Sequence, residues 1–135
     1  MIRVPLMLLT FDYELPMGHR LMNHQGKCRY LHGHNYLIRV ELQGHVDMTG
    51  MVIDFSDLKT RVKGIFERWD HAFALHELDP AAEEIRAYAR LILLPVHPTA
   101  EELAITWRDE LQKSFPIHHV YIAVKETRDC GVVLE

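Results

Sequence analysis

Alternating apolar and polar residues predict a long strand in the first third of the chain. Side chains two residues apart point to the same face of a strand. On one face this pattern gives His32, His34, Tyr36, Ile38, Val40 and Leu42. The opposite face carries Gly33, Asn35, Leu37, Arg39 and Glu41, so the segment is expected to bury chiefly one side. An apolar opening segment, Met1 to Thr10, predicts a first strand that extends over Met7 to Tyr13.

A period of three to four residues predicts helices further along. Turn residues fill Gly44 to Gly50, and Met51 to Ile53 is expected to be a short strand end. Asp54 can then cap a helix whose apolar positions are Phe55, Leu58, Val62, Ile65, Phe66 and Trp69. Residues 81–90, rich in Ala and Glu, predict a short second helix. A third begins at Thr99, which can form a capping box with Glu102, and buries Leu103, Trp107 and Leu111.

Two further strands are expected near the end, at Val120 to Val124 and at Val132 to Leu134. The resulting order, β-β-α-α-β-β, predicts an α+β fold with the helices on one face of an antiparallel sheet. Since there is no internal repeat or low-complexity linker, we expect one domain over residues 1–135.

Composition narrows the class of protein. The chain is 48% hydrophobic and 25% charged, as globular domains are, and it has no apolar run of about 18 residues that could span a membrane. Its net charge of −4 argues against nonspecific nucleic-acid binding. The two cysteines, Cys28 and Cys130, are too few for a disulfide framework, which favours a cytoplasmic location.

Two histidines at the start of the long strand indicate a metal site. His32 and His34 share one face, with Cα atoms about 6.6 Å apart, a reach that lets both imidazoles bind one Zn²⁺. A third ligand must come from elsewhere. His19, in a loop-like segment, is the first candidate, and His24 is its competitor. Three protein ligands would leave a coordination position open, as in catalytic zinc sites.

Three other features have weaker chemical signals. Cys28 is flanked by Lys27 and Arg29, which favour a thiolate, although an isolated cysteine is more often an ordinary buried residue. Asp70 could orient His71 for proton transfer, yet such a dipeptide is more often a solvated pair. Glu126 could accept hydrogen bonds from the N–H groups of a heterocycle, but alone it resembles any surface glutamate.

Taken together, the motifs resemble those of the 6-pyruvoyltetrahydropterin synthase / 6-carboxytetrahydropterin synthase (QueD) family. They occur in one order over nearly the whole chain. The segments are His19-Arg20-Leu21, Gly26-Lys27-Cys28, His32-Gly33-His34-Asn35-Tyr36, Gly50-Met51-Val52-Ile53-Asp54-Phe55, Asp70-His71, Pro98-Thr99-Ala100-Glu101 and Lys125-Glu126-Thr127. The resemblance implies a tunnelling (T-) fold with a four-stranded antiparallel sheet, whose subunits close into a barrel as a trimer or homohexamer with active sites at subunit boundaries.

The resemblance also implies a role for each matching residue. His19, His32 and His34 would hold Zn²⁺, Cys28 would be the catalytic thiolate, and Asp70 with His71 would relay protons. Glu126 would anchor the amino-pyrimidine edge of the pterin, with Thr99 and Glu101 as lesser candidates. The implied substrate is 7,8-dihydroneopterin triphosphate, a small molecule. Candidates for its triphosphate are Arg20, Lys27, Arg29 and Arg128.

The spacing from thiol to histidine favours one branch of the family. Cys28 and His32 follow the Cys-x-x-x-His-x-His pattern of the carboxy-forming enzymes, which feed queuosine biosynthesis. The chain departs from the family at Leu15 to Gly18, after His71, and in the long connection from His71 to Pro98. The alternatives are the pyruvoyl-forming synthase and a non-catalytic zinc or pterin-binding protein.

Overall fold

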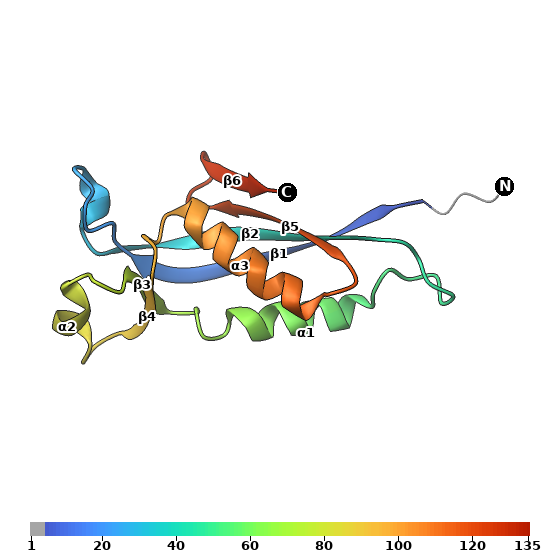
Figure 1. The fold of residues 1–135 in the computed structure, drawn as a ribbon, viewed down its shortest axis with the longest axis horizontal. Helices are drawn as coiled ribbons and strands as arrows, with labels where there is room; N and C mark the ends of the chain where they lie inside the picture. Colours follow the sequence, from blue (N-terminus) through green and yellow to red (C-terminus); the bar gives the residue numbers. More distant parts are fainter. Residues whose placement is uncertain (1–4) are drawn as a thin grey trace.

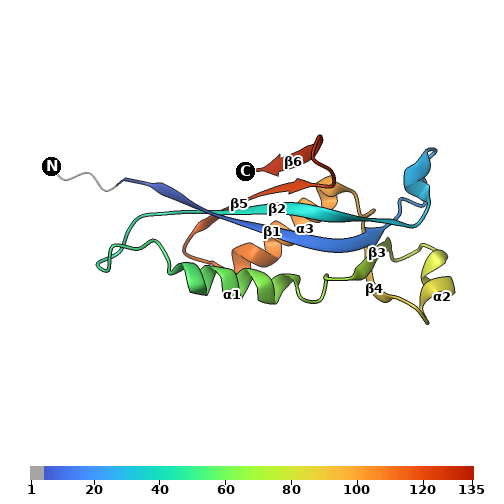
Figure 2. The same ribbon diagram turned by 180° about the vertical axis from the view of Figure 1, so that it is seen from behind.

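A six-stranded sheet, covered on one face by two helices, organises the chain (Figures 1 and 2). The computed structural model describes residues 5–135, so the first four residues of the expected opening strand lie outside it. Its strands are β1 (Met7–His19), β2 (His32–Gly44), β3 (Ala72–His76), β4 (Arg90–Leu94), β5 (His119–Lys125) and β6 (Gly131–Leu134). Its helices are the 3-10 turn η1 (Lys27–Arg29), α1 (Phe55–Phe66), α2 (Ala81–Ile85) and α3 (Ala100–Ser114).

The hairpin of β1 and β2 positions the residues of interest. The two strands pair antiparallel over their full length, from Met7 opposite Gly44 to His19 opposite His32. Because paired residues share a face, Met17 and His34 lie on the same side as His19 and His32. Tyr36 and the apolar residues that follow it on this face are buried under the helices, as the alternation predicts.

The first strand has a long unpaired edge. The sheet order is β4-β3-β1-β2-β5-β6, but β1 pairs with β3 only at Gly18 and His19. Within residues 5–135, the rest of that edge, from Met7 to Met17, therefore has no strand partner. The outer strands β4 and β6 each leave one further edge open.

Capping fixes where the two long helices begin. The Asp54 carboxylate accepts backbone N–H groups of Ser56 and Asp57 at the start of α1. The Thr99 hydroxyl accepts the N–H of Glu102 at the start of α3, which is the first half of the expected capping box. Both helices bury most of the apolar positions that the period predicts, although Ile65 is only partly buried. Phe55 is exposed, and Trp69 is buried just beyond the end of α1.

Several expectations about individual elements are wrong. The sheet has six strands rather than four, and β3 and β4 are parallel to their neighbours. The helix expected over 81–90 ends at Ile85, after which β4 begins at Arg90. The segment Met51 to Ile53 is not a strand, and His19 ends β1 instead of lying in a loop. A short apolar run between turns is compatible with either a helix or a strand, which explains the missed β4.

Candidate metal centre

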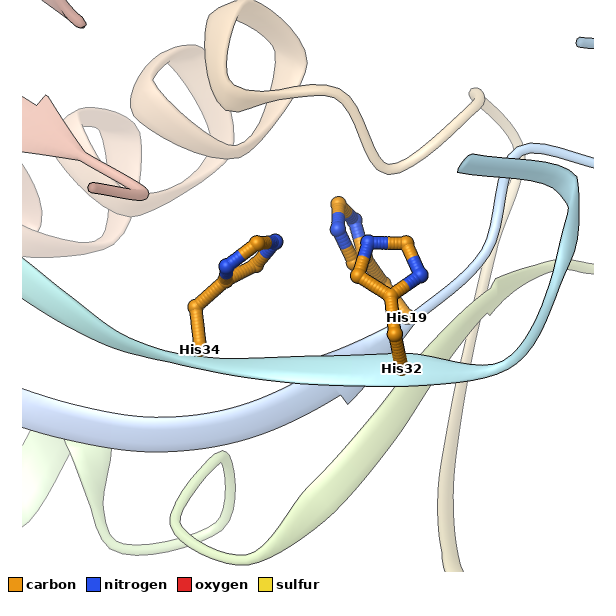
Figure 3. A group of neighbouring side chains, drawn as sticks. All are labelled: His19, His32 and His34. Atoms are coloured by element: carbon orange, nitrogen blue, oxygen red, sulfur yellow. The ribbon is translucent and has the colours of Figure 1, made fainter. Parts of the chain in front are cut away.

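Three histidine rings converge above the closed end of the hairpin. His19 comes from the end of β1, and His32 and His34 come from the start of β2, all on one face of the sheet (Figure 3). One ligand nitrogen from each ring lies within 4.8 Å of the others. The competing candidate, His24, is exposed and accepts the N–H of Gly26, so it lies outside this cluster.

Backbone carbonyls orient two of the rings. The Nδ1 atom of His19 lies 2.8 Å from the carbonyl oxygen of Pro98, and that of His32 lies 2.6 Å from the carbonyl oxygen of Tyr30. Each Nδ1 therefore donates its proton, which leaves Nε2 as the free lone pair. The Nε2 atoms of His19 and His34 are buried and have no hydrogen-bond partner. Buried, unpartnered nitrogens facing one another are suited to a metal ion.

Burial also keeps two of the rings, those of His19 and His34, in the form that binds metals. It lowers the pKa of His19 to about 4, an effect opposed by the Pro98 carbonyl and assisted by the other two histidines. Burial likewise lowers the pKa of His34, although the nearby Glu126 opposes this shift. Neutral imidazole is the metal ligand, so this side-chain set fits a divalent cation such as Zn²⁺.

Glu126 lies beside the histidines rather than apart from them. It follows β5, and its carboxylate oxygens are 3.8 Å from Nε2 of both His19 and His34. A hollow of about 930 Å³ opens here, and its lining includes His34, Glu126 and Arg128. Sequence reasoning proposed Glu126 and Arg128 separately, and the fold brings both to the edge of the metal site.

Cys28 is half-buried and lies on the turn η1, shortly before the strand that carries His32 and His34. The carbonyl oxygen of Cys28 accepts the N–H of Leu21, at 2.8 Å. The carbonyl oxygen of Arg29 accepts a hydrogen bond from Nη1 of Arg20, and the carbonyl oxygen of Tyr30 accepts one from the ring N–H of His32. Three consecutive carbonyls of this turn are thus held by residues at or beside the two histidines that flank it.

Tyr36 is a site residue that sequence reasoning missed. Its ring lies edge-on to those of His19 and His34, with centroids 5.8 and 5.3 Å away, and its hydroxyl is buried without a partner. Burial raises the pKa of Tyr36, and the proximity of Glu126 and Cys28 raises it further. The only signal in the sequence was its place on the same alternating face as the two histidines.

Asp70 and His71 form a hydrogen-bonded pair beside β1, outside the cluster of three histidines. The Nδ1 atom of His71 lies 2.7 Å from the Asp70 carboxylate. His71 is exposed and lines a hollow together with Pro16, Asn35 and His34, the last being one of the three clustered histidines. Within one chain, the pair is therefore not part of the three-histidine group.

The backbone of His71 has an uncommon conformation. Its φ of 58° places it in the left-handed region, and its N–H donates to the carbonyl of Pro16. Next to it, Arg90 of β4 donates to the carbonyls of Asp70, Glu67 and Arg68, at 3.1 to 3.3 Å. The turn that presents the imidazole is thus fixed from two sides.

The other candidates have structural roles or exposed positions. Thr99 caps α3, and Glu101 is exposed in the first turn of that helix, next to the Pro98 carbonyl that orients His19. Arg20, a candidate for the triphosphate, instead forms a two-point ion pair with Asp79. Arg29 lies over the ring of its neighbour Tyr30, and Lys27 is exposed.

Comparison with known proteins identifies similar chains. The family model described as 6-pyruvoyl tetrahydropterin synthase matches residues 8–135. A relative in Rickettsia bellii, named 6-carboxy-5,6,7,8-tetrahydropterin synthase, is 36% identical over 91% of this chain and 96% of its own. One in Haemophilus influenzae with the same name is 38% identical over 71% of this chain and 75% of its own.

Solved structures agree with this match at the level of the fold. A 6-pyruvoyl tetrahydropterin synthase from Caenorhabditis elegans is 27% identical, with a TM-score of 0.75 over 100% of this chain and 99% of that one. The enzyme of the same name from Plasmodium vivax, 21% identical, superposes with a TM-score of 0.78 over 96% and 97% of the two chains. The tunnelling fold expected from the motifs is therefore confirmed, apart from the number of strands.

Proposed function

Since this chain belongs to the 6-pyruvoyl tetrahydropterin synthase family, we propose that it is a 6-carboxytetrahydropterin synthase. It would convert 7,8-dihydroneopterin triphosphate to 6-carboxy-5,6,7,8-tetrahydropterin, with loss of acetaldehyde and triphosphate. The observation that carries the proposal is the group of three histidine nitrogens within 4.8 Å of one another, bordered by the Glu126 carboxylate. The names of the relatives and the spacing from Cys28 to His32 favour the carboxy product.

His19, His32 and His34 would hold Zn²⁺ through their Nε2 atoms. Support comes from the carbonyls that occupy Nδ1 of His19 and His32, and from the burial that keeps His19 neutral. The bound metal would act as a Lewis acid toward the hydroxyl groups of the substrate side chain.

Proton transfer would fall to Cys28 and to the Asp70–His71 pair. The Cys28 thiolate would take a proton from the carbon chain of the substrate, since its turn is fixed between two of the metal ligands. His71 would supply or accept a second proton at Nε2, while Asp70 holds Nδ1 and so fixes the ring orientation.

The position of His71 supports a site shared between chains. Because His71 is exposed and lies outside the cluster of its own three histidines, it would serve the metal centre of a neighbouring subunit in a closed oligomer, a trimer or hexamer. The open edge of β1 gives such an oligomer a physical basis, since unpaired N–H and C=O groups gain partners when two edges meet.

Glu126 would bind the substrate through its heterocycle. Its carboxylate can accept two N–H bonds from the amino-pyrimidine edge, and Arg128, which lines the same hollow, is placed for an anionic group of the substrate. Thr99 and Glu101 remain lesser candidates for the same ring, because the loop before them contacts His19. The two free cysteines favour a cytoplasmic location. In the described residues no helix is both long and apolar enough to cross a membrane.

The test is incubation of the purified, zinc-loaded protein with dihydroneopterin triphosphate, followed by mass analysis of the pterin. We expect the 6-carboxy product together with acetaldehyde. A 6-pyruvoyl product would assign the chain to the other branch of the family. Binding of zinc and pterin without turnover would make it a binding protein.

Cys28→Ala separates binding from chemistry. Loss of a positioned proton-transfer group should lower kcat by about 10²–10⁴-fold, while zinc content and secondary structure stay unchanged. Cys130→Ser is the matched control, because Cys130 is exposed near the far end of the chain and should tolerate the change. Near-normal turnover of Cys28→Ala would remove Cys28 from the mechanism.

A further inference from the structure

We propose that the Arg20–Asp79 ion pair is a positioning device that holds the Cys28 turn against the metal-binding hairpin. Asp79 lies in the long connection between His71 and Pro98, and none of the motifs above includes it. The inference rests on the proposed function for its kinetic part only.

Two hydrogen bonds between Arg20 and Asp79 fix the geometry of this ion pair. The guanidinium meets both carboxylate oxygens, with Nε 2.7 Å from Oδ2 and Nη2 on Oδ1. Such two-point pairing fixes direction as well as distance. The Asp79 side chain is fully buried, and its Oδ1 also accepts the N–H of Ala81 at the start of α2. A buried carboxylate of this kind depends on its cation, so Asp79 holds Arg20 in place.

The third nitrogen of the guanidinium, Nη1, contacts the turn that carries Cys28. Nη1 of Arg20 lies 3.3 Å from the carbonyl oxygen of Arg29, the residue after Cys28. The neighbouring backbone N–H, that of Leu21, donates to the carbonyl of Cys28 itself. Two adjacent residues, Arg20 and Leu21, thus hold two adjacent carbonyls of the turn.

The geometry links the thiol to the metal site through this pair. Arg20 directly follows the ligand His19, and the loop that it braces ends at the ligand His32. Only an arginine can fill both roles, because its planar group presents Nε and Nη2 to a carboxylate while Nη1 points elsewhere. A lysine keeps the charge beside Asp79 but cannot also reach the Arg29 carbonyl.

The variants Asp79→Asn and Arg20→Lys test the proposal, in a Cys130→Ser background so that Cys28 is the only thiol. The first readout is hydrogen exchange at the Leu21 amide, and the second is the rate of alkylation of Cys28 by iodoacetamide. In both variants we expect exchange at Leu21 to rise by at least about fivefold, because the turn opens more often. The alkylation rate should change by at least about threefold in both variants.

Turnover gives a third, independent readout. Misplacing the thiol by about 1 Å should lower kcat by up to about 100-fold, while KM and zinc content stay near wild type. Asp12→Asn is the matched control. It removes an Arg–Asp pair of the same two-point geometry, with Arg39, that bridges β1 and β2 on the exposed face. We expect all three readouts of this control to match the wild type.

Wild-type exchange at Leu21 and wild-type alkylation of Cys28 in Arg20→Lys, a variant that keeps the charge in place, would overturn the proposal. The same would hold if Asp79→Asn lost thermal stability without a change in either readout. If the parent protein turns over no pterin, the proposed function fails, but exchange and alkylation still decide the role of the ion pair.

Discussion

His19 and His32 each have one ring nitrogen committed to a carbonyl and one nitrogen free, and this division decides what a single substitution does. Nδ1 of His19 and His32 is occupied by a carbonyl, so removing either ring deletes one Nε2 donor without freeing a replacement. A carbonyl oxygen left behind by His19→Ala would also be buried, which adds a structural cost to the loss of the ligand.

The metal prediction follows from this arrangement. We expect about one zinc per chain in the wild type and a severe loss in His19→Ala and His32→Ala, measured by elemental analysis after dialysis. His24→Ala is the matched control, because the His24 side chain is exposed and its ring accepts the N–H of Gly26, outside the histidine cluster. Full zinc in His19→Ala with loss in His24→Ala would show that the third ligand is His24.

Glu126 supports a prediction about affinity. Glu126→Gln keeps the shape of the side chain but replaces one acceptor oxygen with a donor. It should weaken pterin binding by about 1.5–3 kcal/mol for each charged hydrogen bond lost, while the subunit assembly stays unchanged. Isothermal titration with a non-reacting pterin measures this. An unchanged Kd would make Glu126 a surface residue.

The connection between β3 and α2 makes the stability of the fold depend on pH, because it contains Asp79. Burial alone would raise the pKa of Asp79, but the Arg20 guanidinium and the Ala81 N–H bring it below its ordinary value. A carboxyl group with a lowered pKa in the fold stabilises it above the unfolded value of about 3.9, and this stabilisation is lost as the pH falls through the folded pKa.

Asp79→Asn should therefore lower the free energy of unfolding near neutral pH and have less effect in acid. At pH 7 we expect about 1–3 kcal/mol, below the usual cost of breaking a buried pair, because the Arg20 side chain keeps 22% exposure. Urea unfolding of the metal-free protein should show this difference shrinking below about pH 4. A difference that is constant down to pH 3 would contradict the assignment.

Elements with a long, regular pattern were predictable, and short ones were not. The face of β2 and the caps of α1 and α3 follow from local spacing, so the sequence was sufficient for them. β4 was missed because five mostly apolar residues carry no period that separates a strand from a helix turn. His19 was expected in a loop because Pro16 and Gly18 are turn residues, yet pairing with Gly33 and Asn35 keeps the strand extended.

The same distinction applies to the candidate site. Two histidines two residues apart on a strand share one face, so their proximity could be predicted from the sequence. Cys28 could be added to them because it is close in sequence. Asp79 gave no signal, and Tyr36 gave only its place on the same face as the two histidines, since the importance of an acid or a tyrosine depends on which partner the fold brings to it. Without knowledge of that partner, the sequence suggested an anionic substrate for Arg20. In the structure Arg20 instead forms an ion pair with Asp79.

For the whole molecule, the unpaired edge of β1 predicts self-association. Within residues 5–135, the edge of β1 from Met7 to Met17 has no strand partner, and such an edge is a template for pairing between chains. We expect light scattering at micromolar concentration to give three or six times the chain mass of 15.8 kDa. A monomer at that concentration would contradict both the barrel and a site shared between subunits.

The three histidines also have a consequence for the order of folding. All of them lie between residues 19 and 34, on one hairpin, whereas Pro98 and Glu126 come from far along the chain. Closing so short a loop costs little chain entropy and can precede the distant contacts. Zinc held by this hairpin would thus stabilise the folding transition state along with the native state. It should accelerate refolding more than it slows unfolding.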